Sequence, residues 1–268
     1  REDQVYLCSP ETAAASALTG VIADPRTLEM AYPHFVEPKT ICLNTEMLVA
    51  ANDDAPFRET LNQADLVVAD AAGLVLAARL LGQSLNERVT GSDGIHRLAA
   101  HCARSGYRPF FLGAAPGVAE EVAERLVAAN PGLNVAGTFA GTPHSGDEDE
   151  IIALVRAAQP DLLFVAYGVP AEEKWIARNR ERLGVPAMIG VGGSFDFVAG
   201  VTKRAPAWMR RLGLEWLYRL IQEPWRWRRQ LALPRFLFLV FKQRLMASGG
   251  LTGATRTQSN DHSVEEQE

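Results

Sequence analysis

Short apolar runs alternate with amphipathic segments along most of the chain. The apolar runs predict strands at residues 40–44, 65–70, 108–117 (where a strand enters a Gly/Pro turn), 133–139, 161–168 and 186–193. Between them, apolar residues at helical spacing predict helices at 73–82, 91–106, 118–129, 147–158 and 172–183. Strands that are apolar throughout and alternate with amphipathic helices are typical of a parallel sheet covered on both faces. We therefore expect an α/β fold built on a mainly parallel sheet.

Ligands of such folds bind beyond the carboxyl ends of the strands. The residues predicted to lie there are Asn44 and Thr45, Asp70, Gly113 to Gly117, Gly168 to Pro170, and Gly192 to Asp196. These positions are the candidate site.

Asp70 ends one of these strands and precedes a helix. It fits an N-cap, whose side chain accepts hydrogen bonds from the first turn, and it equally fits a general base at the mouth of the sheet. "GAAPG" at 113–117 is either a phosphate-binding turn at a helix N-terminus or an ordinary tight turn. Asp196, between two phenylalanines, needs a partner or a function if it is buried.

The last part of the chain has a different composition. The stretch "RRLGLEWLYRLIQEPWRWRRQLALPRFLFLVFKQRL" (210–245) concentrates arginine, tryptophan, phenylalanine and leucine. From Lys203 to Arg244 there are eleven Lys or Arg and two acids, a net +9 in a chain of −5, so the remaining residues carry −14. A basic segment on an acidic body predicts an anionic partner for that segment.

We divide the chain accordingly into a globular domain (1–200), a basic aromatic appendage (201–247) and a disordered tail (248–268). Residues 1–39 are poorly patterned. No apolar run reaches the roughly 18–20 residues that span a bilayer. The charged start predicts no signal peptide, although a first residue of Arg1 leaves open that an upstream segment is missing.

Other chemistries are poorly supported. The three cysteines are scattered, and the five histidines share no metal-ligand spacing. "DED" at 147–149 formally fits a metal-binding DxD pattern, but it opens a helix, where acids complement the helix dipole. A dinucleotide-binding oxidoreductase would need GxGxxG, which is absent. A non-catalytic membrane-surface module would explain the basic segment but not the polar strand ends, and we expect no nucleic-acid binding.

Several segments together resemble one family. They are "DLVVADAAGLVLAARLLG", "RVTGSD", "FFLGAAPGVAEEVAERL", "PDLLFVAYGVPAEEKWI", "GVGGSFDFVAG" and "KRAPAWMRRLGLEWLYRLIQEPWRWRR", in this order. The chain resembles the WecG/TagA/CpsF glycosyltransferases (glycosyltransferase family 26) from about Thr40 to Arg229. The resemblance implies a Rossmann-like fold and an inverting transferase that needs no metal or other cofactor.

The resemblance also implies substrates and a location. The donor would be a UDP-sugar, N-acetylmannosamine or a related hexose, and the acceptor a polyprenyl-diphosphate-linked sugar. The product would serve teichoic-acid linkage units, enterobacterial common antigen or exopolysaccharide. We expect a cytoplasmic enzyme bound peripherally to the inner face of the membrane through residues 213–245. The sequence does not decide whether the enzyme forms a homo-oligomer.

By the same resemblance, Asp70 matches the catalytic base. Arg88 and Asp196 match pocket positions, and Arg219, Arg226 and Arg229 match appendage arginines that close over the diphosphate. With the strand-end residues, the expected substrate-binding set is Asn44, Thr45, Arg88, Gly113, Gly168, Glu172, Asp196, Arg219, Arg226 and Arg229.

Three departures from the family pattern leave the donor open. Cys42 stands where the family often has threonine, and Ala71 stands where glycine is usual. Glu172 takes the glutamine position of GxPxQE. A carboxylate there would disfavour an acidic sugar unless Arg or Lys pairs with it.

Overall fold

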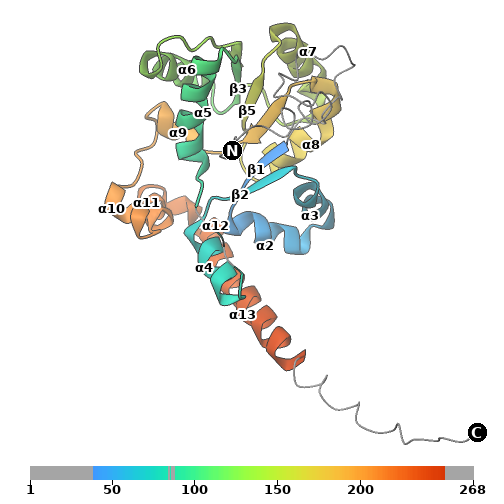
Figure 1. The fold of residues 1–268 in the computed structure, drawn as a ribbon, viewed down its shortest axis with the longest axis vertical. Coiled ribbons are helices and arrows are strands. Elements are labelled where there is room, and N and C mark those ends of the chain that lie inside the picture. Colours follow the sequence, from blue (N-terminus) through green and yellow to red (C-terminus); the bar gives the residue numbers. More distant parts are fainter. Residues whose placement is uncertain (1–38, 84, 86–87, 251–268) are drawn as a thin grey trace, which may run out of the picture. The chain divides into compact units, whose positions relative to one another are not determined.

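The computed structural model describes residues 39–83, 85 and 88–250, with side chains described as far as residue 246. The poorly patterned start up to residue 38 and the predicted tail beyond Gly250 lie outside the described residues. The centre of the fold is a six-stranded sheet in the order β2-β1-β6-β5-β3-β4 (Figure 1). All its pairings are parallel, which confirms the predicted α/β fold. The strands are β1 (Lys39–Leu43), β2 (Leu66–Ala69), β3 (Pro109–Gly113), β4 (Gly137–Phe139), β5 (Leu162–Ala166) and β6 (Ala187–Gly190).

Helices cover both faces of the sheet. On one face lie α5 (Gly91–Ser105), α6 (Val118–Ala129) and α9 (Ser194–Val198), around a core that includes stacked Phe111 and Phe164. On the other lie α7 (Glu148–Ala158) and α8 (Ala171–Leu183), around the fully buried Trp175. The helices α2 (Thr45–Asp53) and α3 (Ala55–Asn62) bury Ile41 of β1. Burial on both faces explains why β3, β5 and β6 contain no alternating polar residues.

Local capping sets where the helices meet the strand ends. The side chain of Thr90 accepts a hydrogen bond from the backbone N–H of Asp93, and α5 ends at Gly106 with φ +74°. The side chain of Asn44 does the same for Met47 at the start of α2. Such caps satisfy backbone groups that a helix end leaves unpaired, so each helix starts at a defined residue beside the sheet edge.

The appendage is a series of short helices followed by a long one. It contains α10 (Ala207–Arg211), α11 (Glu215–Gln222), the 3-10 turn η3 (Pro224–Arg226), α12 (Trp227–Gln230) and α13 (Ala232–Gly250). Pro234 falls in the first turn of α13, where its missing N–H is tolerated. The helix also continues through residues 248–250, which we had placed in the tail. Within the residues that the structure describes, no helix is long and apolar enough to cross a bilayer.

The appendage is joined to the core by ion pairs. Arg204 pairs with Asp93 of α5 at 2.6 Å and with Glu215 at 3.1 Å, and Arg235 pairs with Asp53 of α2 at 2.7 Å. The anionic partner predicted for the basic segment is therefore in part the acidic body of the same chain. The guanidinium of Arg204 holds the pKa of Asp93 at about 2.

Candidate active site

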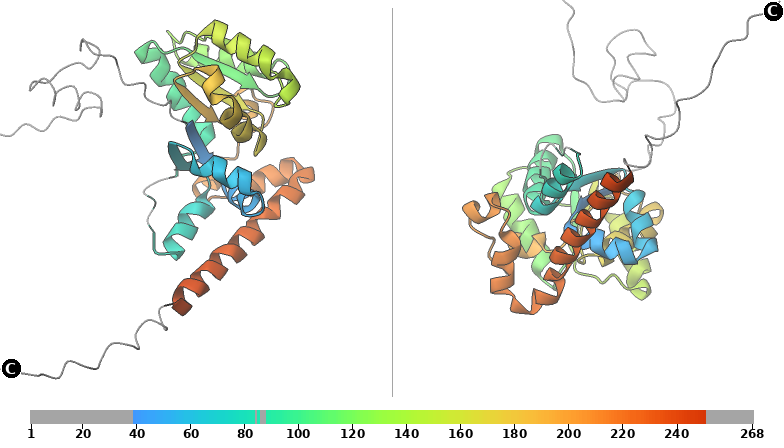
Figure 2. Two further views of the ribbon diagram at one scale, coloured as in Figure 1. Left: turned by 90° about the vertical axis from the view of Figure 1, so that its right-hand side faces the viewer. Right: turned by 90° about the horizontal axis from the view of Figure 1, so that it is seen from below.

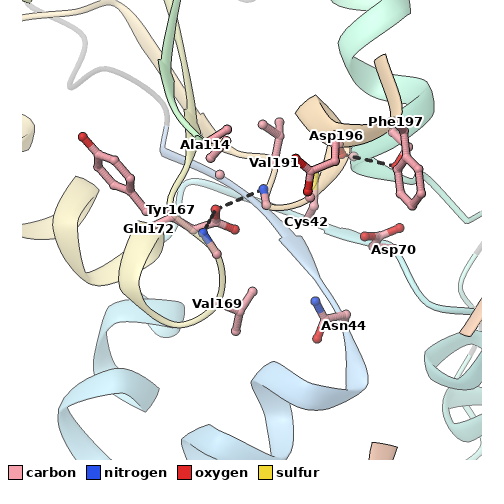
Figure 3. A pocket seen from close by; sticks show the side chains of 18 of the residues that line it. Cys42, Asn44, Asp70, Ala114, Tyr167, Val169, Glu172, Val191, Asp196 and Phe197 are labelled. Carbon is pink, nitrogen blue, oxygen red and sulfur yellow. Dashed lines mark hydrogen bonds between the residues drawn. The ribbon is translucent and has the colours of Figure 1, made fainter. Parts of the chain in front are cut away.

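A cavity of about 520 Å³ opens at the carboxyl ends of the strands (Figure 3). Five strand ends contribute to it, those of β1, β2, β3, β5 and β6, together with the appendage. The close view shows the side chains of Asn44, Asp70, Glu172 and Asp196 around this hollow. The position agrees with the rule that predicted it.

Asp70 follows β2 directly and lines the cavity. Its backbone N–H donates to the carbonyl of Leu43 at 2.8 Å, which extends the β1–β2 ladder and fixes the residue. Burial, and then the charge of Glu215, raise the pKa of the Asp70 carboxyl to about 7, while Arg88 and the N–H of Gly91 oppose the shift. A carboxylate with a pKa near the working pH is suited to general base catalysis.

Asn44 and Glu172 fix the polar floor of the cavity. Because Oδ1 of Asn44 accepts from the N–H of Met47 at 3.0 Å, its amide nitrogen faces the cavity (Figure 3). One oxygen of Glu172 accepts from the N–H groups of Gly168 and Gly192, at 2.9 and 3.0 Å. Glu172 thus ties together the two loops that follow β5 and β6.

Burial, and then the neighbouring Glu173, raise the pKa of Glu172 to about 8. Near neutral pH the carboxyl is therefore largely protonated and uncharged, like the glutamine amide that the family pattern has here. A carboxyl that is harder to ionise would repel an acidic donor less than a free carboxylate would, and the preferred donor stays a prediction.

Three appendage arginines converge on the cavity, and two carboxylates hold them. One oxygen of Glu223 pairs with Arg219 at 3.1 Å and with Arg226 at 3.2 Å. Glu46 holds Arg229 through two parallel bonds of 2.8 and 2.9 Å. Paired bonds of this kind fix the orientation of the guanidinium as well as its position.

The guanidinium of Arg219 lies against Gly193 in the loop after β6 and against Phe197 of α9. It is 5.0 Å from the ring centroid of Phe197, and a Cβ at Gly193 would come within 2.6 Å of its Nη2. A side chain at position 193 would displace the guanidinium from this contact. Asp196 on α9 is close enough for Arg219 to lower its pKa, although burial is the larger effect and raises it.

Arg226 has an unused donor. Its Nε is buried and has no hydrogen-bond partner among the described residues. Burial lowers the pKa of Arg226, and the charges of Arg219 and Arg229 lower it further. An unpaired buried donor beside two other cations marks a place that an anion would stabilise.

A second cavity of about 320 Å³ adjoins the first. It lies between the start of α4 (Ala72–Leu80), the start of α2 and the appendage, and Arg88 and Trp216 are among its lining residues. Some residues line both cavities: Asn44, Glu46, Asp70, Ser92, Phe197, Arg219, Arg226 and Arg229. Asp70 therefore lines both chambers, and so do the three arginines.

Comparison with known proteins decides the family. The family model described as "Glycosyl transferase WecG/TagA/CpsF family" matches residues 29–249. The chain belongs to this family of glycosyltransferases. The family and the class of enzyme predicted from the motifs are thereby confirmed.

Three relatives carry the name N-acetylglucosaminyldiphosphoundecaprenol N-acetyl-beta-D-mannosaminyltransferase. The protein of Bacillus subtilis (strain 168) is 34% identical over 78% of this chain and 83% of its own length. The protein of Bacillus spizizenii is 35% identical over 82% of this chain and 85% of its own. The protein of Staphylococcus aureus (strain MW2) is 29% identical over 76% and 80%, respectively.

Most of the site residues predicted for this WecG/TagA/CpsF family member come together in the structure. The first cavity is lined by Asn44, Asp70, Gly168, Glu172, Asp196, Arg219, Arg226 and Arg229. Thr45 and Arg88 line the second. Gly113, as the described residues place it, lines neither: its φ is +109°, and a Cβ would come within 2.7 Å of the carbonyl of Ala166. Gly113 therefore shapes the turn, and Ala114 and Ala115 after it reach the cavity.

The structure also locates the alternatives weighed from the sequence. Asp70 is not a side-chain cap, because α4 begins after Ala71 with no side-chain cap bond. In "DED", Glu148 pairs with Arg178 and Asp149 with Arg182, which ties α7 to α8. In the described part of the chain, no three His, Cys, Asp or Glu side chains gather as a metal site requires. Metal independence of the transfer stays a prediction.

Sequence reasoning missed the carboxylates that hold the arginines. Glu46 could have been noticed, because it follows Asn44 and Thr45 at a strand end. Glu223 stands between Arg219 and Arg226 in the family motif, at helical spacing from each. The short contact between the hydroxyls of Ser92 and Ser194, 3.2 Å apart, gave no signal at all, because 102 residues separate them.

We expect Glu46→Gln to raise the KM for the donor about two- to fivefold and to leave kcat within about twofold. The amide keeps the size of the side chain but removes the charge that orients Arg229, and the pair is partly exposed, so the effect is modest. Steady-state kinetics with varied donor measure both constants. The double exchange Glu46→Arg with Arg229→Glu keeps an ion pair between α2 and the appendage. If it restored the donor KM, Arg229 would not be a donor ligand.

Proposed function

We propose that this glycosyltransferase transfers an N-acetylmannosaminyl or closely related hexosyl group from a UDP-sugar to a polyprenyl-diphosphate-linked sugar. The observation that carries the proposal is that Asp70 and three arginines line the same two chambers in a member of this family. The printed names of the relatives support both the transferred sugar and the lipid-linked acceptor. The product would enter a cell-surface polysaccharide: a teichoic-acid linkage unit, a common antigen or an exopolysaccharide.

The first chamber suits the donor. It combines backbone N–H groups of glycine-rich loops, the amide of Asn44 and the three arginines. Arginine matches the geometry of phosphate through two parallel bonds, and the N-terminus of α5 adds a favourable dipole. The loops after β3 and β5 leave room for the nucleoside end, with Ala114 and Tyr167 among the lining residues.

The second chamber suits the acceptor sugar. Its lining includes Trp216 and Leu233 of the appendage, and it meets the first chamber at Asp70. In the proposed step, Asp70 takes the proton of an acceptor hydroxyl while that oxygen attacks the anomeric carbon. The new C–O bond forms as the bond from the anomeric carbon to the diphosphate oxygen breaks, and UDP leaves from the opposite face. This single displacement inverts the anomeric centre.

The departing diphosphate needs positive charge in place before it forms. Arg219, Arg226 and Arg229 supply it from the appendage, and Glu46 and Glu223 hold them in position until the donor enters. No metal is required in this scheme. The residues that activate the acceptor come from the core, and those that stabilise the leaving group come from the appendage.

The acceptor's lipid would place the reaction at a membrane surface. The appendage exposes Trp208, Trp225 and Trp227, and from Lys203 to Arg244 it carries eleven Lys or Arg against two acids. Aromatic and basic side chains together favour the interface of an anionic bilayer. We propose peripheral attachment through residues 213–245 at the inner face of the cell membrane.

A transfer assay tests the proposal. UDP-N-acetylmannosamine and other UDP-sugars are offered with a short-chain polyprenyl-diphosphate-N-acetylglucosamine, and the product is identified by mass spectrometry and its linkage by NMR. We expect one added sugar, release of UDP and an inverted anomeric centre. Lipid binding without transfer from any UDP-sugar would favour the non-catalytic membrane module, and tight NADH binding would favour an oxidoreductase.

We expect kcat to rise with pH through about pH 7 and then to level off. The pKa of Asp70 is raised to about 7 chiefly by burial, and only the deprotonated carboxylate can accept the acceptor's proton. A pH–rate profile under saturating substrates measures this ionisation. A kcat that is independent of pH from 5 to about 8 would exclude Asp70 as the titrating base.

A further inference from the structure

The sequence pattern predicts that the helix at 73–82 covers a face of the sheet, like the other predicted helices. Helix α4 is arranged differently. It runs beside α13, and the two helices extend together from the strand ends (Figures 1 and 2). Leu74 and Ala77 of α4 pack with Phe236 and Val240 of α13. Near their carboxyl ends, Nη1 of Arg244 donates to the carbonyl of Leu80 at 2.9 Å. A core helix and an appendage helix thus form one packed pair.

The sides of the pair that do not face each other expose large apolar side chains. On α4, Leu76 is 55% exposed. On α13, Phe238 is 66%, Phe241 is 54% and Leu245 is 73% exposed. Single exposed leucines are ordinary, but several large apolar residues gathered on two adjoining helices mark an interaction surface. We refer to Leu76, Phe238, Phe241 and Leu245 as the tip surface.

The charged residues of α4 and α13 themselves all have one sign, although Arg235 is paired with Asp53 of α2. Neither α4 nor α13 contains Asp or Glu, and together they carry Arg79, Arg235, Lys242 and Arg244. In a chain of net charge −5, an acid-free pair of helices is a local exception. Apolar side chains within a basic surround fit an anionic lipid surface. They fit a second copy of the same surface poorly, because the like charges would face each other.

We propose that α4 and α13 together form the surface that contacts the bilayer, so that the core itself enters the lipid interface and not only the appendage. The partner is a membrane with anionic headgroups. This inference rests on the proposed function, since it concerns how a lipid-linked acceptor reaches the base.

The position of Asp70 gives the contact a catalytic consequence. Asp70 lies two residues before α4, and α4 has nine residues, so at 1.5 Å per residue the helix spans about 14 Å. A bilayer that holds the far end of α4 therefore holds Asp70 at a fixed height above the lipid surface. The diphosphate of a membrane-embedded acceptor would rise into the second chamber, whose lining includes the start of both helices.

The test separates lipid contact from catalysis. Full-length wild type, Leu76→Glu and the control Leu154→Glu are sedimented with vesicles of phosphatidylglycerol and phosphatidylcholine. Each is also assayed with a vesicle-embedded long-chain acceptor and with a water-soluble short-chain acceptor. Leu154 is a matched control because it is 41% exposed and lies on α7, away from α4 and α13.

We expect Leu76→Glu to weaken vesicle binding about tenfold or more and to lower kcat/KM on the embedded acceptor in proportion, with unchanged turnover of the soluble acceptor. Leu154→Glu should match wild type in every assay. As a second variant, Leu76→Trp should strengthen vesicle binding while turnover of the soluble acceptor stays unchanged, which a folding defect could not mimic. If both Leu76 variants bound vesicles as wild type does, the proposal would be overturned. It would also be overturned if Leu76→Glu lost a dimer but kept vesicle binding, because the surface would then bind a second copy of the chain. Absence of transfer to either acceptor by wild type would instead overturn the proposed function.

Discussion

Replacing Asp70 by asparagine is expected to lower transfer about 10²–10⁴-fold while the protein stays folded. The amide has nearly the same shape as the carboxyl but cannot accept the acceptor's proton. Asp70 lines both chambers, where it can reach an acceptor hydroxyl from one and a donor from the other. Single-turnover transfer from the UDP-sugar to the short-chain acceptor measures the chemical step directly.

The control for this variant is the binding of UDP, which involves the arginines and not Asp70. UDP affinity should stay within about twofold of wild type, and circular dichroism should be unchanged. Asp70→Asn should also lose the rise of kcat through about pH 7, because the titrating group is gone. Turnover like that of wild type would remove Asp70 as the base. Glu215 would then be examined next, since it raises the pKa of Asp70 and lies in the second cavity.

The strand-end residues were predictable because one rule governs them all. Parallel strands deliver their carboxyl ends to the same edge, so an apolar run that stops at a polar residue already locates that residue. This rule locates Asp70 and Asn44 from the sequence alone. The same rule predicted that Gly113 binds substrate, but Gly113 does not line either of the two cavities described above. The rule cannot distinguish the turn residue that shapes a loop from the neighbouring residue that faces the cavity.

The pairing of Glu46 with Arg229 could not be predicted, and the reason is physical. Glu46 and Arg229 are 183 residues apart, and their pairing depends on how the appendage packs against α2. Composition showed an excess of positive charge, and a motif indicated a phosphate site, but neither shows which acid neutralises a given arginine in the free enzyme. The same holds for α4: its apolar pattern predicts a helix with a buried side, but not whether the sheet or α13 provides the burial.

Arg226→Ala is expected to lower kcat/KM about 10²–10³-fold, as the loss of one preorganised donor to a developing anion does elsewhere. The buried Nε of Arg226 has no partner among the described residues, so the diphosphate would be its acceptor. Its Nη1 already pairs with Glu223, which fixes the orientation of the guanidinium before the donor binds. Initial rates with varied UDP-sugar, and UDP binding by calorimetry, divide the effect between affinity and turnover.

Arg228→Ala is the matched control, because Arg228 is only two residues away from Arg226. Its guanidinium lies 5.5 Å from the ring centroid of Trp227. As the described residues place it, Arg228 lines neither of the two cavities. This control variant should transfer sugar to the short-chain acceptor at the wild-type rate. Arg226→Lys should recover little activity, since an ammonium keeps the charge but loses the second parallel bond to phosphate. Full recovery in the lysine variant would mean that Arg226 supplies only charge. Equal losses in Arg226→Ala and Arg228→Ala would mean that the appendage acts through its packing, and the leaving group would then need another source of stabilisation.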